Sequence, residues 1–138
     1  MKRILAAFGT AAVVFAGVIS TAPAASAADG WCGSTVDVSR NGYSTLVPST
    51  TSGSTSCVMG RGSSGDPVSE LQRALAICHN LDVGAIDGVY GARTEAAVRT
   101  LQSRNGLSPD GVYGPNTRNA VSWRWYAYPS GGGTCARL

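Results

Sequence analysis

The sequence has little charge, and from residue 28 onward it contains no lysine. Of its eleven Lys and Arg residues, Lys2 and Arg3 precede residue 28, which leaves nine arginines against eight acidic residues and a formal net charge of +1. Proteins that bind nucleic acid gain most of their affinity by neutralising phosphates with clustered cations. A nearly neutral chain of this kind is not expected to bind nucleic acid, and it offers little attraction to a membrane surface.

Histidine and closely spaced cysteines are also scarce. His79 is the only histidine, and the sequence has no Cys-x-x-Cys pair, so the ligand clusters of a zinc site are missing. The Asp-Gly turns at Asp87 and Asp110 lack the alternating acidic ligands of a calcium loop. We therefore expect no bound metal and no cofactor.

Catalytic groups are equally sparse. A single His79 beside a cysteine is weak support for a nucleophilic triad. Asp87 and Asp110 could form a carboxylate pair for acid–base chemistry, but they occupy equivalent positions of an internal repeat, which favours a structural role. The sequence predicts no catalytic residue and no enzyme activity.

Residues 1–27 have the layout of a secretory signal peptide. Lys2 and Arg3 form a positive n-region, residues 4–19 are an uncharged apolar run, and residues 25–27 form a small-x-small cleavage site. The apolar run is shorter than the roughly 20 residues that a membrane span needs. We expect cleavage before Ala28, no membrane attachment afterwards, and a secreted protein that is extracellular or associated with the cell wall.

Four cysteines follow the expected cleavage site, and an even number in an exported chain indicates two disulfides. Three pairings are possible. We favour Cys32–Cys57, which would close the polar N-terminal segment, and Cys78–Cys135, which would tie a helix end to the C-terminal tail. The remaining length supports one small domain with a marginal core, for which covalent cross-links are common. We expect a monomer.

Three amphipathic helices are indicated between residues 57 and 128. Asp66 and Pro67 suit a helix start, apolar residues follow at helical spacing, and Asn80 is a fair left-handed terminator. Similar start and stop signals recur twice downstream. The expected helices are residues 66–79, a segment between Gly91 and Asn105, and a segment after Gly114.

The segments on either side of these helices show no helical period. Residues 28–56 are rich in Ser, Thr and Gly, so we expect an irregular, disulfide-tethered N-terminal arm, although Asn41-Gly42 is a plausible hairpin turn. Residues 129–138 are expected to form a C-terminal tail. No long alternating run indicates a strand in the helical region. The predicted fold class is all-α, a compact three-helix bundle at residues 57–128.

One phrase occurs twice in the helical region. IDGVYGARTEAAV begins at Ile86, and PDGVYGPNTRNAV begins 23 positions later at Pro109. In each copy the Asp-Gly pair predicts a tight turn, because Gly accepts positive φ and the Asp side chain can bond the amides that follow. Thr94 and Thr117 then fall in the first helical turn, where a hydroxyl can cap free amides. The repeat predicts a turn that starts a helix, twice.

Three stretches together carry a family resemblance. GRGSSGDPVSELQRAL, IDGVYGARTEAAVRTLQSRNGL and PDGVYGPNTRNAV resemble the three-helix peptidoglycan-binding domain over roughly Gly60 to Trp123. The resemblance implies a three-helix fold, attachment to the bacterial cell wall and, usually, a fused wall hydrolase. The arm is too short and polar to be a hydrolase, so we expect a stand-alone module. Domains of this fold also occur in metalloprotease propeptides, but their inhibitory cysteine motif has no match here.

Several side chains are candidates for binding a ligand. Gln72 and Gln102 could exchange hydrogen bonds with a peptide, or they could tie helices together. Arg93 and Arg118 could hold carboxylates of wall stem peptides by bidentate hydrogen bonds, or they could be ordinary surface arginines. The positions that differ between the two copies, including Asn116, follow the turns and can face outward.

The aromatic cluster WRWYAY at residues 123–128 is another candidate. An exposed ring of Trp123 could carry a sugar, or it could close a small core. Helical geometry would keep Trp123 and Trp125 from sharing a face. The predicted ligand-binding residues are Gln72, Arg93, Thr94, Gln102, Asn116, Arg118 and Trp123.

The sequence thus predicts a non-catalytic secreted module that binds peptidoglycan, by its stem peptide or its glycan, in a shallow groove between the second and third helices. The alternative is a disulfide-stapled extracellular protein that uses the same fold to bind another protein, as an inhibitor or a signal. The cysteine-bounded arm supports this alternative, because the family core does not need it.

Overall fold

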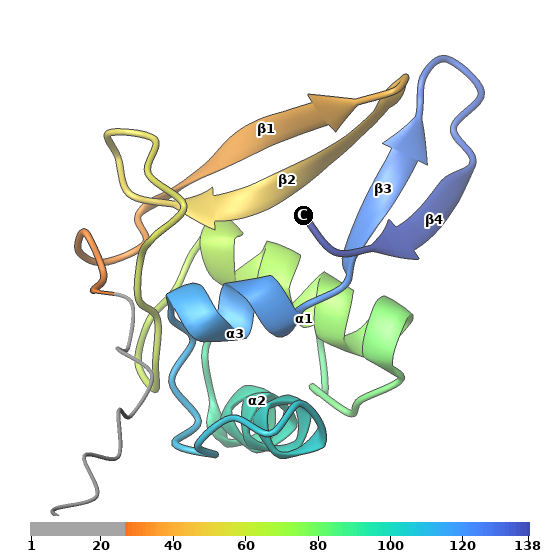
Figure 1. The fold of residues 1–138 in the computed structure, drawn as a ribbon. Helices are drawn as coiled ribbons and strands as arrows, with labels where there is room; N and C mark the ends of the chain where they lie inside the picture. Colours follow the sequence, from red (N-terminus) through yellow and green to blue (C-terminus); the bar gives the residue numbers. More distant parts are fainter. Residues whose placement is uncertain (1–26) are drawn as a thin grey trace, which may run out of the picture.

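The computed structural model describes residues 27–138, which form three helices and a four-stranded antiparallel sheet, with the first helix packed against the sheet (Figure 1). The predicted signal peptide falls almost entirely on residues 1–26, which lie outside the described residues. The helices are α1 (Asp66–His79), α2 (Ala92–Arg104) and α3 (Pro115–Ala120), and the strands are β1 (Ser34–Arg40), β2 (Tyr43–Ser49), β3 (Trp123–Ala127) and β4 (Gly133–Ala136).

The prediction of an all-α three-helix bundle is wrong, because the segments on both sides of the helices form a sheet. Strands β1 and β2 lie in the stretch 28–56, which was expected to be an irregular arm, and β4 lies in the expected tail 129–138. The strand order is β1-β2-β3-β4, and every neighbouring pair is antiparallel. The two ends of the chain are therefore joined through β2 and β3.

The first hairpin forms because its turn and its buried face both suit it. Asn41 and Gly42 have φ values of 51° and 79°, the conformation that a two-residue hairpin turn requires. Val36 pairs with Val47, and this face of the hairpin packs on α1. Because serines and threonines are abundant in this segment, its alternation of apolar and polar residues is weak in the sequence. Burial of the alternating face on α1 nevertheless stabilises the strands.

The aromatic cluster forms strand β3 and not part of a helix. Residues two apart in a strand point to the same face, so Trp123 and Trp125 both enter the core, and each is 1% exposed. The expectation that these two indoles would lie on different faces is therefore wrong. They join the helix residues Leu71, Leu75 and Val98 in one hydrophobic cluster, so the sheet and the helices share a single core.

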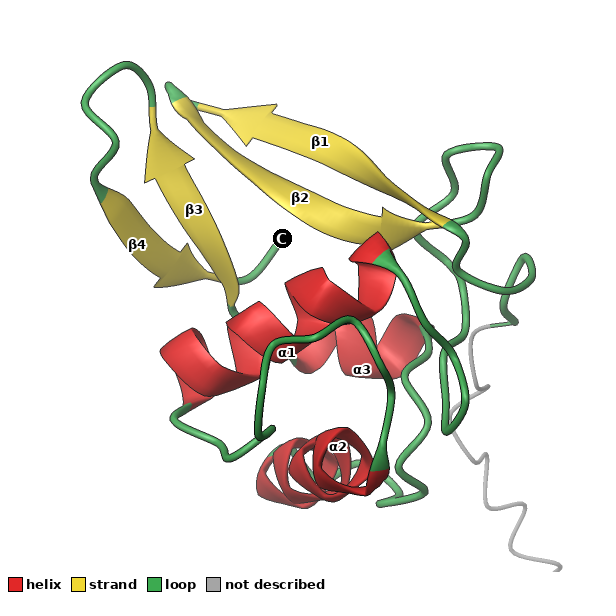
Figure 2. Cartoon of the chain, turned by 180° about the vertical axis from the view of Figure 1, so that it is seen from behind, coloured by secondary structure: helices red, strands yellow, loops and turns green. Residues whose placement is uncertain are grey.

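The three predicted helices are present, and α1 has the predicted bounds. Asn80 is left-handed with φ 52°, and the amide of Leu81 donates to the carbonyl of Leu75, which closes the end of α1. Figure 2 shows from behind that α1 lies between the sheet and α2. None of the helices in residues 27–138 is both long and apolar enough to cross a membrane.

Both favoured disulfides, Cys32–Cys57 and Cys78–Cys135, are confirmed. The first holds the start of the first hairpin against the segment that leads to α1. The second joins the last turn of α1 to β4 and spans 57 positions of the sequence. It therefore links the helical region to the far edge of the sheet.

Candidate functional site

The first copy of the repeat is organised around a buried glutamine on α1. The Nε2 group of Gln72 donates to Asp87 Oδ1 at 3.1 Å, to the Val89 carbonyl at 3.0 Å and to Thr94 Oγ1 at 3.0 Å. Its Oε1 accepts a hydrogen bond from the Gly88 amide at 3.0 Å. We call Gln72, Asp87, Gly88 and Thr94 the first turn cluster.

The second copy repeats this arrangement bond for bond around a glutamine on α2. The Nε2 group of Gln102 donates to Asp110 Oδ1 at 2.9 Å, to the Val112 carbonyl at 2.8 Å and to Thr117 Oγ1 at 3.0 Å, while its Oε1 accepts from the Gly111 amide at 2.9 Å. We call Gln102, Asp110, Gly111 and Thr117 the second turn cluster. A glutamine suits this position because its amide both donates and accepts, which satisfies the polar groups of a buried turn.

The aspartate of each cluster also holds its own turn. Asp87 Oδ1 accepts from the Val89 amide, and Asp110 Oδ1 accepts from the Val112 amide, each at 2.9 Å. The Val89 amide and then Gln72 hold the pKa of Asp87 below its ordinary range, so this exposed carboxylate is charged at neutral pH. Gly88 and Gly111 have φ values of 71° and 75°, as the Asp-Gly turns predicted.

A hollow lies outside each cluster. The first, of about 340 Å³, is bounded by the segment after α1 and the start of α2, and its lining includes Gly84, Asp87, Val89 and Arg93. The second, of about 250 Å³, lies between the end of α2 and the start of α3, and its lining includes Leu107, Ser108, Asp110, Val112 and Asn116. The second hollow coincides with the groove that was predicted between the second and third helices.

Four of the predicted ligand-binding residues are buried. The side-chain polar atoms of Gln72, Gln102 and Thr94 form hydrogen bonds within the turn clusters. For the two glutamines this is the structural role that the sequence left open beside ligand binding. Thr94 accepts from Gln72 and does not cap α2, so the expected capping role is wrong. Trp123 lies in the core, where its ring meets that of Tyr113 edge to face at 6.3 Å.

The other three predicted residues reach the surface at different places. Arg93 lies across the first hollow, where its Nη1 is 3.7 Å from Asp82 Oδ1 and its Cδ packs near Gly84. Asn116 is exposed at the second hollow, and within residues 27–138 its side chain makes no hydrogen bond to the protein. Arg118 lines neither hollow, because it donates to Thr55 Oγ1 at 2.8 Å and to Asn119.

Most of the residues that line the second hollow were not predicted as ligand contacts, among them Leu107 and Ser108. These two occupy the positions that Gly84 and Ala85 hold in the first copy, 23 residues earlier, and both of those residues line the first hollow. Extending the repeat two positions toward its N-terminus would have identified all four residues as rim positions.

Comparisons with known proteins place this geometry in a family. Residues 64–121, which contain both turn clusters, match the family model described as "Putative peptidoglycan binding domain". The chain is 35% identical over 134 residues to an uncharacterized protein of Kitasatospora aureofaciens, and the match covers 94% of this chain and 95% of that protein.

Two further matches cover only part of the chain. A probable N-acetylmuramoyl-L-alanine amidase of Bacillus licheniformis is 41% identical over 75 residues, which are 54% of this chain but only 21% of the amidase. The crystal structure of the SleB N-terminal domain is 40% identical, with a TM-score of 0.43, and the match covers 46% of this chain and 85% of that domain. The chain thus spans about a fifth of the length of the amidase.

Proposed function

We propose that this chain, which belongs to the peptidoglycan-binding domain family, is a non-catalytic binding module. Its ligand would be the stem peptide of cell-wall peptidoglycan, bound in the second hollow. Signal-directed export by residues 1–27 and a monomer at the wall are parts of the same proposal. The two disulfides support it, since such bonds persist in oxidising compartments outside the cytosol.

The observation that carries the proposal is the difference between the two hollows. In the first hollow, Arg93 lies over Gly84 and faces Asp82, so a side chain of the protein already occupies part of the space. In the second hollow, Asn116 stands at the equivalent position and leaves its amide free for an external partner. The second hollow is the smaller of the two, but its free amide makes it the better candidate ligand site.

The chemistry of the second hollow suits a short peptide. The Asn116 amide can both donate to and accept from a peptide unit, and the Asp110 carboxylate at the rim can accept from an amide or ammonium group. Leu107 and Val112 add apolar contact area. Asp110 is the only carboxylate that lines this hollow and is held by Gln102 and the Val112 amide, which suits recognition more than proton transfer.

The experiment is co-sedimentation of the mature, oxidised protein with purified peptidoglycan sacculi. We expect the parent to be retained at moderate salt and Asn116→Ala to bind about two- to tenfold more weakly, the effect of one lost hydrogen bond. Arg93→Ala is the matched control, because it alters the equivalent position of the other copy and should leave retention unchanged.

Three outcomes would contradict the proposal. Failure of the folded parent to bind sacculi would remove the wall-binding function. Loss of retention in Arg93→Ala but not in Asn116→Ala would place the ligand in the first hollow. Release of soluble wall fragments by the purified protein would show that it is not merely a binding module.

A further inference from the structure

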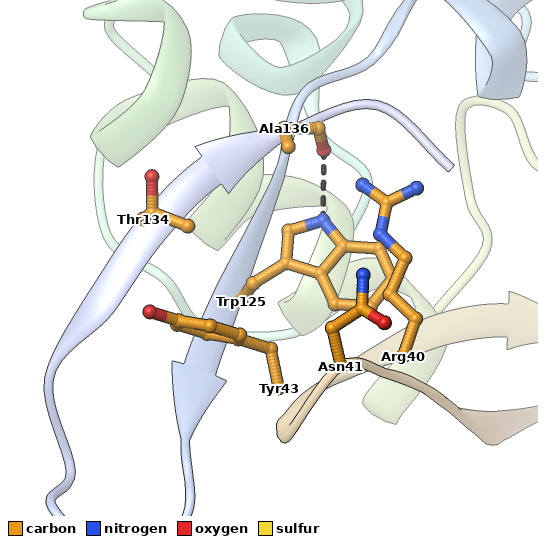
Figure 3. A pocket seen from close by; sticks show the side chains of 6 residues that line it. All are labelled: Arg40, Asn41, Tyr43, Trp125, Thr134 and Ala136. Atoms are coloured by element: carbon orange, nitrogen blue, oxygen red, sulfur yellow. Dashed lines mark hydrogen bonds between the residues drawn. The ribbon is translucent and has the colours of Figure 1, made fainter.

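The tips of the two hairpins lie side by side, outside the family match (Figure 1). Two adjoining hollows lie there, and Figure 3 shows the smaller one. Tyr43 pairs with Ala127 there, and the amide of Tyr128 donates to the carbonyl of Gly42 at 3.1 Å. We call the two spaces together the hairpin hollow. One, of about 150 Å³, is lined by Arg40, Asn41, Tyr43, Trp125, Thr134 and Ala136. The other, of about 460 Å³, shares the first three and adds Ser39, Gly42, Ser44 and Tyr128.

The floor of the hairpin hollow is fixed before any ligand arrives. The indole N–H of Trp125 donates to the Ala136 carbonyl at 3.0 Å (Figure 3). The Arg40 guanidinium lies over the Trp125 ring, 4.2 Å from its centroid, and donates to the Arg137 carbonyl at 2.7 Å. Groups held in this way lose little freedom when they bind a ligand.

The rim offers aromatic faces beside neutral polar groups. Tyr43 is 40% exposed and Tyr128 is 89% exposed, so both phenol rings are accessible. Asn41 adds an amide that makes no side-chain hydrogen bond within residues 27–138, and Thr134, which pairs with Trp125, adds a hydroxyl. No acidic residue lines either space, which disfavours a cationic ligand.

This combination fits a sugar ring. The C–H face of a pyranose can lie on an aromatic ring, while its hydroxyl and acetamido groups bond to amide, hydroxyl and guanidinium groups around it. We propose that the hairpin hollow is a second binding site and takes pyranose rings of the wall glycan. The choice of the wall glycan rests on the proposed function, whereas the fit to a sugar rests on the hollow itself.

Two sites on one small domain would hold different parts of the same polymer. The second hollow would take the stem peptide, and the hairpin hollow would take the glycan strand. Because both parts belong to one polymer, the second contact is effectively intramolecular and raises retention beyond that of either site alone. The sheet would thus add glycan recognition to the helical repeat.

The test uses a peptide-free probe, the hexamer of N-acetylglucosamine, titrated into the mature oxidised protein. Calorimetry gives the affinity, and nuclear magnetic resonance maps the site through the Trp125 indole N–H and the Asn41 amides. We expect both signals to shift and the Asn116 amide to stay unchanged. Tyr43→Ala and Tyr128→Ala should each weaken binding about three- to tenfold, as expected for one lost stacking contact.

Trp31→Ala is the control. Trp31 is 72% exposed, precedes β1 and lines neither part of the hairpin hollow. Its removal should not change the affinity. Tyr128→Ala should not impair folding, because a side chain that is 89% exposed contributes little to the core. A loss of binding in this variant would therefore reflect a lost contact with the sugar.

The two proposals can fail separately. If the hexamer binds and Asn116→Ala has no effect on sacculi, the helical site is wrong and the sheet site stands. If the hexamer does not bind, or if Tyr43→Ala and Tyr128→Ala bind it as the parent does, the sheet proposal is overturned. A protein partner would then be the better candidate ligand for the surface around Tyr43 and Tyr128.

Discussion

The two turn clusters have the same interior and different surroundings. In each, a buried glutamine satisfies an Asp-Gly turn and the threonine that follows, and corresponding hydrogen bonds agree in length within 0.2 Å. Outside, Arg93 of the first copy corresponds to Asn116 of the second, and Glu95 corresponds to Arg118. The repeated residues therefore encode the scaffold, and we propose that the residues that differ determine what each hollow binds.

The helices that follow the two clusters also differ. The first cluster starts α2, with 13 residues, while the second starts α3, with six. After α3 the amide of Ser122 donates to His79 Nε2 at 2.8 Å, and the chain continues into β3. Glu95 pairs with Arg61 and Arg99, whereas Arg118 bonds to Thr55. The same turn thus leads into a long surface helix in one copy and into the sheet in the other.

The largest effect should come from removing either glutamine. Gln72→Leu and Gln102→Leu each keep the approximate shape but leave a buried glycine amide and a threonine hydroxyl without their partner. We expect each to lower the free energy of unfolding by about 2–4 kcal/mol, and by similar amounts. Denaturant unfolding measures this, with the exposed Thr100→Ala as a control. If one of the two variants left the free energy of unfolding nearly unchanged, the two clusters would not be energetically equivalent.

A smaller and unequal effect is expected at the two glycines. Both have positive φ, so an added Cβ costs about 1–2 kcal/mol at each. At Gly88 the Cβ would also lie 2.8 Å from Ser69 Oγ and 3.2 Å from the Gly65 carbonyl oxygen, which is backbone. At Gly111 it would lie 2.7 Å from Glu95 Cγ and 3.0 Å from Arg99 Nε, which belong to flexible side chains.

Gly88→Ala should therefore destabilise the protein more than Gly111→Ala, with a total near 3 kcal/mol for the first. Thermal unfolding of the two variants side by side measures the difference. Equal melting temperatures would mean that the Gly65 backbone moves away as easily as the Glu95 and Arg99 side chains.

The smallest effect concerns His79, which accepts the Ser122 amide after the second copy. Burial, and then the charges of Arg104 and Arg137, hold the pKa of His79 below its ordinary value of about 6.5. The folded state thus binds a proton less readily than the unfolded state. The stability that neutral His79 contributes is complete above about pH 6.5, and it is lost as the pH falls through the lowered pKa.

Unfolding measured from about pH 7.5 to about pH 5 should show this loss. His79 is the only histidine in the sequence, so His79→Gln, which cannot titrate, should flatten the profile over this range. A parent profile that is already flat would show that protonation of His79 does not disturb its contact with Ser122.

The helical region could be predicted from sequence because its signals are local. Asp66, Pro67 and Asn80 mark the ends of α1 by their own side chains and backbone preferences, and the Asp-Gly pairs mark the turns. The sheet could not be predicted in the same way. The two hairpins are local, but they form one sheet only through burial against α1 and through the pairing of β2 with β3, segments about 80 residues apart, such as Tyr43 with Ala127.

The candidate site was predicted only in part. The sequence predicted a groove between the second and third helices and named Asn116, which is exposed and lines the second hollow. It did not distinguish the outward residues from Gln72 and Gln102, since a glutamine on a helix looks the same in sequence whether it faces water or a buried turn. The hairpin hollow was not predicted, because Tyr43 and Tyr128 come together only when the sheet forms.

The most direct test of this account is the retention of Asn116→Arg on peptidoglycan sacculi, with Arg93→Asn as its counterpart in the first copy. If the copies share a scaffold and the ligand occupies the second hollow, an arginine at position 116 should remove the Asn116 amide and place a long cationic side chain in the ligand's position. The account predicts an unchanged melting temperature and a loss of retention for Asn116→Arg alone. Retention equal to that of the parent would contradict it.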